Sequence, residues 1–136
     1  MILIIHPRVH INTSEAFAWL KEDQSKQEHQ AHHVPQHMNK NSDDLLDSPV
    51  EKWSGVFMND FEIPVTNRFE PGKNALGLLK NSGADYIQMT GSGSSVYGIF
   101  EKRGNPLNDS KMTEMAQNVA EKASKEGFFV YFGALA

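Results

Sequence analysis

The sequence predicts a single layered α+β domain in which four short antiparallel strands form a sheet with helices packed mainly on one face. Apolar runs at residues 2–5, 84–89, 96–100 and 128–132 have the length of strands. Helical patterns separate the first run from the second and the third from the fourth. The second and third runs are joined by a short Gly/Ser segment, which is typical of a hairpin. Elements in this order form a ferredoxin-like domain.

The composition describes one acidic domain without cysteine. The chain has 136 residues, and a domain of this size buries about 65–70% of its unfolded surface. A formal net charge of −4 argues against general binding to nucleic acids or anionic membranes. The absence of cysteine excludes disulfide and thiolate chemistry. No apolar run approaches the ~18 residues of a membrane span and the N-terminus lacks a signal peptide pattern, so we expect a soluble cytoplasmic protein.

The N-terminal third contains a strand, a short helix and a long polar segment. The apolar run at residues 2–5 predicts a buried strand. Asn12 or Thr13 is a suitable N-cap for a short helix that reaches Leu20. Residues 21–47 are dominated by Lys, Gln, His, Asn and Asp, and we expect a surface loop or a partly disordered insertion there.

Four histidines lie in this polar segment. His29, His33 and His37 have the spacing that would place three imidazoles on one helix face, as a metal site requires, and His32 lies beside them. Pro35 would interrupt such a helix, and no carboxylate stands at a matching step. We therefore expect a solvated segment and no metal site.

Three helices are expected between residues 48 and 83. Ser48, followed by a proline, is typical of a helix start. Asn59 or Asp60 would cap the second helix, and the third begins near residues 70–72 and has Gly83 at its C-terminal end. The apolar positions of these helices are Val50, Trp53, Val56 and Phe57, then Phe61, Val65 and Phe69, then Ala75, Leu76, Leu78 and Leu79.

The clearest helical pattern lies near the C-terminus. After a turn at residues 102–108, Asp109 or Ser110 is expected to cap a helix that Gly127 ends. Apolar residues recur along this helix with the 3.6-residue period of an amphipathic face. They are Met112, Met115, Ala116, Val119, Ala120 and Ala123.

The segment 91–95 between the hairpin strands is the strongest candidate for a ligand site. Glycines at alternate positions reach positive φ and let a ligand approach the main chain, and successive amides form a concave nest that attracts phosphate. The P-loop is excluded because no lysine lies in the segment, and the dinucleotide fingerprint is excluded because Val96 stands at its third glycine. From the residues alone, a purely structural turn remains the alternative.

Three segments together resemble the C-terminal half of the GHMP kinases, the superfamily of galactokinase and of homoserine, mevalonate and phosphomevalonate kinases. They are HINTSEAF at residues 10–17, NDFE at 59–62, and MTGSGSSVYGIF at 89–100. The third segment alone resembles only the glycine-rich third motif of the superfamily. The first two favour the branch whose substrate is cytidine diphosphate methylerythritol. The resemblance covers nearly the whole chain and is weakest over residues 21–47.

This resemblance implies roles for particular residues. The glycine segment would lie near the phosphates of ATP and the substrate hydroxyl, where amides and hydroxyls position the transferring group. Its members are Gly91, Ser92, Gly93, Ser94 and Ser95. Thr13 and Phe17 would line the substrate pocket, with Phe17 stacked on the cytosine ring. Asn59 and Asp60 match a family motif, and we expect their role to be structural.

The resemblance also implies that part of the enzyme is absent from this sequence. The principal ATP loop of the superfamily, Pro-x-x-x-Gly-Leu-Gly-Ser-Ser, has no counterpart here, and neither the catalytic aspartate nor its lysine can be assigned. The abrupt start in a buried strand agrees with an isolated C-terminal domain. We expect this domain to be inactive alone, to bind ATP and Mg²⁺ only with its N-terminal ATP-binding domain, and to self-associate through the uncovered interface.

Two other functions remain open from the sequence. The chain could belong to another GHMP small-molecule kinase, which would keep the chemistry and change the substrate. It could also be a free-standing, non-catalytic ligand-binding domain of ferredoxin-like fold, in which the glycine segment is only a turn.

Overall fold

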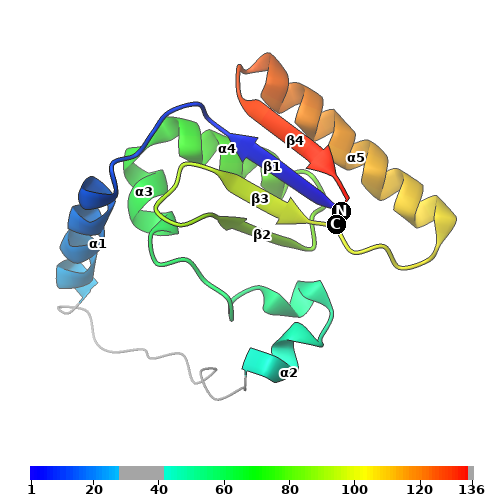
Figure 1. Cartoon of the computed structure of the whole chain (residues 1–136), viewed down its shortest axis with the longest axis horizontal. Helices are drawn as coiled ribbons and strands as arrows, with labels where there is room; N and C mark the ends of the chain where they lie inside the picture. The colour runs from blue at the N-terminus through cyan, green and yellow to red at the C-terminus, as the bar shows by residue number, and fades with distance from the viewer. Residues whose placement is uncertain (28–41, 135–136) are drawn as a thin grey trace.

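The sheet has the predicted architecture. A computed structural model describes residues 1–27 and 42–134. Its strands are β1 (Ile2–His6), β2 (Tyr86–Met89), β3 (Val96–Ile99) and β4 (Phe129–Gly133). They form one sheet in the order β2-β3-β1-β4, and every neighbouring pair is antiparallel (Figure 1). The α+β, ferredoxin-like prediction is therefore confirmed, with β2 and β4 as the edge strands.

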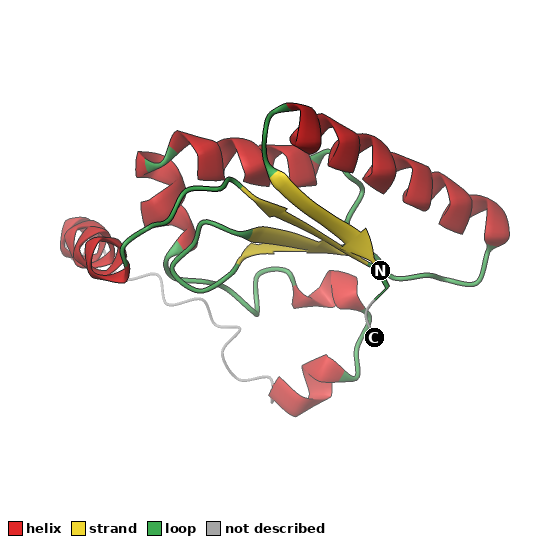
Figure 2. Cartoon of the chain, turned by 45° about the horizontal axis from the view of Figure 1, so that its top comes forward, coloured by secondary structure: helices red, strands yellow, loops and turns green. Residues whose placement is uncertain are grey.

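The main helices cover one face of this sheet. The helical elements are α1 (Thr13–Gln27), α2 (Ser42–Leu46), the 3₁₀ helix η1 (Val50–Trp53), α3 (Glu62–Arg68), α4 (Glu70–Lys80) and α5 (Pro106–Lys125). The helices α4 and α5 pack on the sheet, α4 mainly on β2 and β3 and α5 mainly on β4. Figure 2 shows them on one side of the sheet and the short helices α2 and η1 on the other. No helix within the described residues is long and apolar enough to cross a membrane.

Strand alternation places the core between the sheet and these helices. Leu3 and Ile5 are fully buried, and each such side chain contributes about 1.5–3 kcal/mol when removed from water. Gly98 pairs with Leu3, and a Cβ on Gly98 would lie 2.9 Å from the Cβ of Ala84. The close approach of the chain to β3 therefore requires a glycine at this position. On the opposite face of the sheet, Phe129 is about half exposed.

Two of the predicted boundaries are wrong in the first half of the chain. The loop expected over 21–47 is helical at both described ends, because α1 continues to Gln27 and α2 occupies Ser42–Leu46. The remaining residues 28–41, which include the four histidines, lie outside the described residues. Ser48 does not cap a following helix, since its hydroxyl donates to the Leu45 carbonyl and only the short η1 follows.

The other predictions that the structure corrects concern the residues at which helices begin. Asn105 caps α5, with its side chain accepting from the amides of Leu107 and Asn108, so the helix begins before the expected Asp109 or Ser110. The turn predicted at 102–108 is correspondingly shorter. Helix α3 begins at Glu62, and its N-cap has no side-chain hydrogen bond. Gly127 and Gly83 have the positive φ expected at helix ends, although Gly83 lies two residues beyond the C-cap of α4.

Candidate functional site

The glycine loop, residues 90–95, is a tight turn between β2 and β3. The Thr90 amide donates to the Ser95 carbonyl over 2.9 Å, and the Gly93 amide donates to the Thr90 carbonyl over 2.9 Å. Among the described residues, the amides of Gly91 and Ser92 donate to no other group. The amides of Ser94 and Ser95 also have no acceptor there, so four amides of the loop are left without an internal partner. An anion-binding turn requires such donors.

The two loop glycines have different surroundings. Both have positive φ, at +49° for Gly91 and +93° for Gly93. A Cβ on Gly91 would meet no heavy atom within 4 Å, whereas a Cβ on Gly93 would lie 3.0 Å from the Met89 sulfur and 3.3 Å from the Ile11 side chain. Gly91 thus faces open space that a ligand can enter, and Gly93 is packed against the core.

The start of α1 lies beside this loop. Thr13 is the first residue of the helix, and its Oγ1 is 3.4 Å from Oγ of Ser92. The Asn12 side chain accepts from the Ser14 amide over 2.9 Å, in agreement with the predicted N-cap. The fold therefore brings a residue expected at the substrate pocket against a residue expected at the phosphate side, although 79 positions separate them.

Ser94 has a different orientation from the other loop serines. It is 2% exposed, and its hydroxyl donates to the Val9 carbonyl over 2.6 Å. This bond ties the loop to the segment that leads from β1 into α1. The side chain of Ser94 thus anchors the loop.

Phe17 forms an aromatic wall on the next turn of α1. Its side chain is 51% exposed and meets the ring of Phe61 edge to face, with ring centroids 4.9 Å apart. The buried contact fixes one edge of the ring, and the exposed surface leaves room for a planar ligand.

An ion pair holds α1 to α3. Arg68 donates to both carboxylate oxygens of Asp23, over 2.7 and 3.1 Å, and also pairs with Glu22. Hydrogen bonding from Arg68 lowers the pKa of Asp23, and hydrogen bonding from Lys26 is the main cause that lowers the pKa of Glu22. The helix that carries Thr13 and Phe17 is thereby fixed at its other end.

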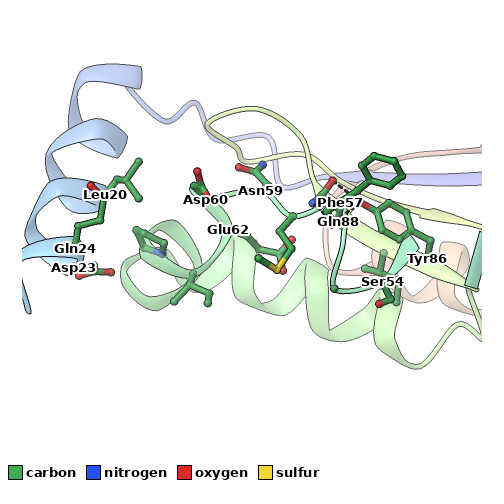
Figure 3. Close-up of a pocket in the computed structure, with 15 residues that line it drawn as sticks. Leu20, Asp23, Gln24, Ser54, Phe57, Asn59, Asp60, Glu62, Tyr86 and Gln88 are labelled. Carbon is green, nitrogen blue, oxygen red and sulfur yellow. Dashed lines mark hydrogen bonds between the residues drawn. The ribbon is translucent and has the colours of Figure 1, made fainter. Parts of the chain in front are cut away.

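Two hollows lie next to these elements. A shallow one of about 600 Å³ borders the glycine loop and is lined by residues 58–61, Gln88–Gly91 and Tyr97. A deeper one of about 470 Å³ lies between α1, α3 and β2, and Figure 3 shows Asp23, Asp60 and Glu62 among its lining residues. Only the first is bordered by the glycine loop, through Thr90 and Gly91, and neither hollow is lined by Thr13, Phe17 or Ser92.

The wall of the deeper cavity contains a buried hydrogen-bond cluster. The Tyr86 hydroxyl is 2.7 Å from Oε1 of Gln88 and 3.0 Å from the Phe57 carbonyl, and Nε2 of Gln88 donates to the same carbonyl (Figure 3). Burial raises the pKa of Tyr86, so its phenol stays protonated. This cluster fixes the loop before α3 against the sheet.

No metal centre is found in the part of the chain that the structure describes. Residues 1–27 and 42–134 contain no group of three or more His, Asp or Glu side chains arranged to hold an ion. Residues that could bind a catalytic cation therefore do not cluster at the glycine loop. The four histidines that were considered as metal ligands lie outside the described residues.

Sequence reasoning missed the contacts that the side chains of Asn59 and Glu62 make with the glycine loop and the end of β2. Both side chains hydrogen-bond to the main chain of Met89–Gly91, beside the loop. The NDFE segment predicts a helix start, because its polar residues stand where N-caps occur, and it matches a family motif in which we expected a structural role for Asn59 and Asp60. Its spacing to the glycine segment was the one available signal.

The chain is similar in sequence to known kinases. No family model matches the chain. A kinase of Bacteroides thetaiotaomicron named 4-diphosphocytidyl-2-C-methyl-D-erythritol kinase is 36% identical over 103 residues, which are 76% of this chain and 33% of that protein. The kinase of the same name from Azobacteroides pseudotrichonymphae is 32% identical over 106 residues, which are 78% of this chain and 35% of that protein.

The fold is also found in a solved structure. A crystal structure of 4-(cytidine 5'-diphospho)-2C-methyl-D-erythritol kinase matches with a TM-score of 0.55 and 16% identity, covering 96% of this chain and 40% of that one. The chain spans about a third of the length of the curated relatives it matches. The chain therefore belongs to the 4-diphosphocytidyl-2-C-methyl-D-erythritol kinase family.

Proposed function

We propose that the chain is the C-terminal domain of an ATP-dependent kinase that phosphorylates the 2-hydroxyl of 4-diphosphocytidyl-2-C-methyl-D-erythritol. The similarity to kinases of that name over three quarters of the chain supports the reaction. The observation that carries the proposal is the 3.4 Å approach of Thr13 to Ser92, which joins the two expected halves of the site. A substrate hydroxyl and a phosphoryl group must meet at such a junction.

In this proposal the glycine loop binds phosphate oxygens. The free amides of Gly91 and Ser92 are suitable donors, and the open space beside Gly91 admits a ligand. When bound, ATP would supply the γ-phosphoryl group and Mg²⁺ would neutralise its charge, with the ion held by residues other than the described ones of this chain. Because the loop itself contains no cationic side chain, it contributes position and neutral hydrogen bonds, and the positive charge comes from other residues.

The aromatic wall selects the cytidine end of the substrate. Phe17 presents an exposed ring edge and face beside Thr13, at the N-terminal end of α1. Stacking of a base on an aromatic side chain is worth roughly 1–3 kcal/mol. The wall therefore holds the base while the loop holds the phosphates.

We further propose that the catalytic aspartate, its lysine and the principal ATP loop lie outside these 136 residues. The relatives are about three times as long as the matched region, and this sequence contains no Gly-Leu-Gly-Ser-Ser loop. The chain alone is then inactive, and ATP and Mg²⁺ bind in a cleft that a second domain completes. Half-exposed Phe129 and Tyr131 give the open sheet face an apolar character, so self-association of the isolated chain stays a prediction that sedimentation velocity tests.

A titration of the 136-residue chain with cytidine monophosphate tests the wall without requiring activity. We expect Phe17→Ala to weaken binding about 5- to 100-fold, as loss of one stacked base implies. Phe129→Ala is the matched control, because that side chain is equally exposed, at 53%, on a distant strand. Equal affinity in the Phe17→Ala and Phe129→Ala proteins would remove Phe17 from the site.

An activity assay tests the division of the enzyme. We expect no phosphorylation of the methylerythritol substrate by the 136-residue chain, and ATP-dependent phosphorylation by the protein encoded when the reading frame is continued upstream. Activity of the isolated chain would disprove the division. If the complete protein preferred homoserine or mevalonate derivatives, the assignment to the superfamily would stand and the proposed substrate would be wrong. If it had no kinase activity, the alternative of a free-standing binding domain would be favoured.

A further inference from the structure

The side chain of Asn59 holds the main chain at the start of the glycine loop. Its Nδ2 donates to the Met89 carbonyl and to the Gly91 carbonyl, both over 2.7 Å. Its Oδ1 accepts from the Phe61 amide over 3.0 Å. One amide group therefore connects the loop to the segment that begins α3, and it uses separate atoms for the two connections.

Glu62 completes the contact from the same segment. Its Oε2 accepts from the Met89 amide over 2.9 Å. β2 is an edge strand with β3 as its sheet neighbour, so its outer main-chain groups need partners from elsewhere. At Met89 the carbonyl accepts from Asn59 and the amide donates to Glu62, so both outer main-chain groups have a side-chain partner. We call this pair of residues, Asn59 and Glu62, the clamp.

The clamp lies between the loop and the aromatic wall. Phe61, in the middle of the segment, packs edge to face on Phe17. The Phe61 amide is also the donor that Asn59 accepts from. A displacement of the segment would therefore move the carbonyls at the start of the loop and the ring behind Phe17 together.

We propose that Asn59 and Glu62 are positioning residues for phosphoryl transfer: they fix the glycine loop in register with the aromatic wall. The catalytic part of this proposal rests on the proposed function. Neither side chain needs to touch a substrate, since each acts through the main chain of Met89–Gly91. Phosphoryl transfer depends on placement of the reacting groups, and displacements near 1 Å cost about 100-fold in rate.

The alternative role for Asn59 is a simple turn before α3, in which only Oδ1 matters. Aspartate serves as well as asparagine in that role. Asn59→Asp therefore separates the two roles, because it keeps the acceptor for Phe61 and replaces the donating NH₂ by an anionic oxygen facing two carbonyls. A residue that serves only as a helix start would tolerate this change.

Amide hydrogen exchange on the 136-residue chain measures the clamp directly. In Asn59→Asp we expect the Thr90 and Gly93 amides, whose hydrogen bonds close the loop, to exchange about 10- to 100-fold faster. The Val119 amide in α5 should keep its protection. Unchanged exchange at Thr90 and Gly93, or an equal acceleration at Val119, would overturn the proposal.

Two further variants complete the experiment. Asp60→Ala is the matched control, since Asp60 lies in the same segment, is exposed, and forms no side-chain hydrogen bond within the described residues. It should leave the loop amides unchanged. Glu62→Ala should accelerate exchange at Met89 and Thr90 in the same way as Asn59→Asp, because it removes the acceptor at the same edge. A normal loop in Glu62→Ala would remove Glu62 from the clamp.

The kinetic part uses the complete kinase. Asn59→Asp should lower kcat about 10- to 100-fold and change KM for the cytidine substrate by less than about threefold, because the wall stays intact while the loop loses its register. An unchanged kcat, or a loss confined to KM, would overturn the catalytic role. If the complete protein phosphorylates no such substrate, the proposed function fails, and the exchange measurement still decides whether the clamp fixes the loop.

Discussion

The two ends of the β2–β3 hairpin are held by different chemistry. At the glycine-loop end, the neutral amide of Asn59 bonds to two main-chain carbonyls. At the other end, the Asp85 carboxylate accepts from the Glu101 amide over 2.8 Å and from Arg103 over 2.9 Å. Arg103 also pairs with Glu51, at an exposed position.

Because of this difference, we expect salt to affect the two ends of the hairpin to different degrees. Exposed ion pairs are screened by salt and contribute about 0–1 kcal/mol. Hydrogen bonds between neutral groups carry no net charge and are little affected by ionic strength. The glycine-loop end has the Glu62 carboxylate as a further acceptor, but its two bonds from Asn59 are neutral, so we expect its geometry to depend less on salt than that of the opposite end.

The largest expected effect tests the packing of the glycine loop. Gly93→Ala places a Cβ 3.0 Å from the Met89 sulfur at a φ of +93°, so we expect a loss of about 2–4 kcal/mol in the free energy of unfolding. Gly91→Ala is the matched control, because its Cβ meets open space and only the positive φ costs about 1 kcal/mol. Urea unfolding of both variants measures the difference, and equal losses would contradict the packing of Gly93.

A smaller effect is expected at the opposite end of the hairpin. Asp85→Asn removes the charge that pairs with Arg103 and keeps an acceptor for the Glu101 amide. We expect a loss of about 0.5–1 kcal/mol at low salt that shrinks toward zero near ~1 M salt. Urea midpoints at the two salt concentrations measure it. Asn59→Ala should show no such salt dependence, and a similar dependence in both variants would remove the contrast between the two ends.

The smallest effect concerns the pH dependence of the ion pair that holds α1 to α3. Hydrogen bonding from Arg68 lowers the pKa of Asp23 in the folded state, so this contribution to stability is present above the unfolded pKa of about 3.9 and is lost as pH falls through the lowered value. In Arg68→Gln, melting temperature should fall at neutral pH, and its difference from the parent protein should diminish in acid. Lys26→Gln, which removes only an exposed pair within α1, should fall less. A difference between Arg68→Gln and parent that grows in acid would contradict the sign.

The sheet and its main helices could be predicted because their signals are local. The apolar runs and the stripe through Ala116 and Val119 follow from strand alternation and helical period, and both side chains face the core as expected. The true start of α5 had a local signal as well, asparagine followed by proline. The apolar stripe did not reveal this start, because Leu107 in the first turn is exposed and does not continue the stripe.

Other features depend on partners far along the chain. Residues 21–27 carry no apolar stripe, and their helix is held by Arg68, which lies 45 positions beyond Asp23. The two carbonyls that Asn59 binds are 30 and 32 positions away, so no local pattern distinguishes this clamp from a helix cap. The sequence predicts the glycine loop as a candidate site, which stays a prediction, and it does not predict that Ser94 faces inward to the Val9 carbonyl.

The use of an asparagine amide to hold the start of the loop has a consequence for the ageing of the protein. Asparagine side chains hydrolyse slowly to aspartate, and the rate rises with temperature. At Asn59 this reaction would turn the donor to the Met89 and Gly91 carbonyls into an anion facing them. A preparation stored warm would thus accumulate molecules with an intact fold and a displaced loop, and a mass increase of one unit at this residue would identify them.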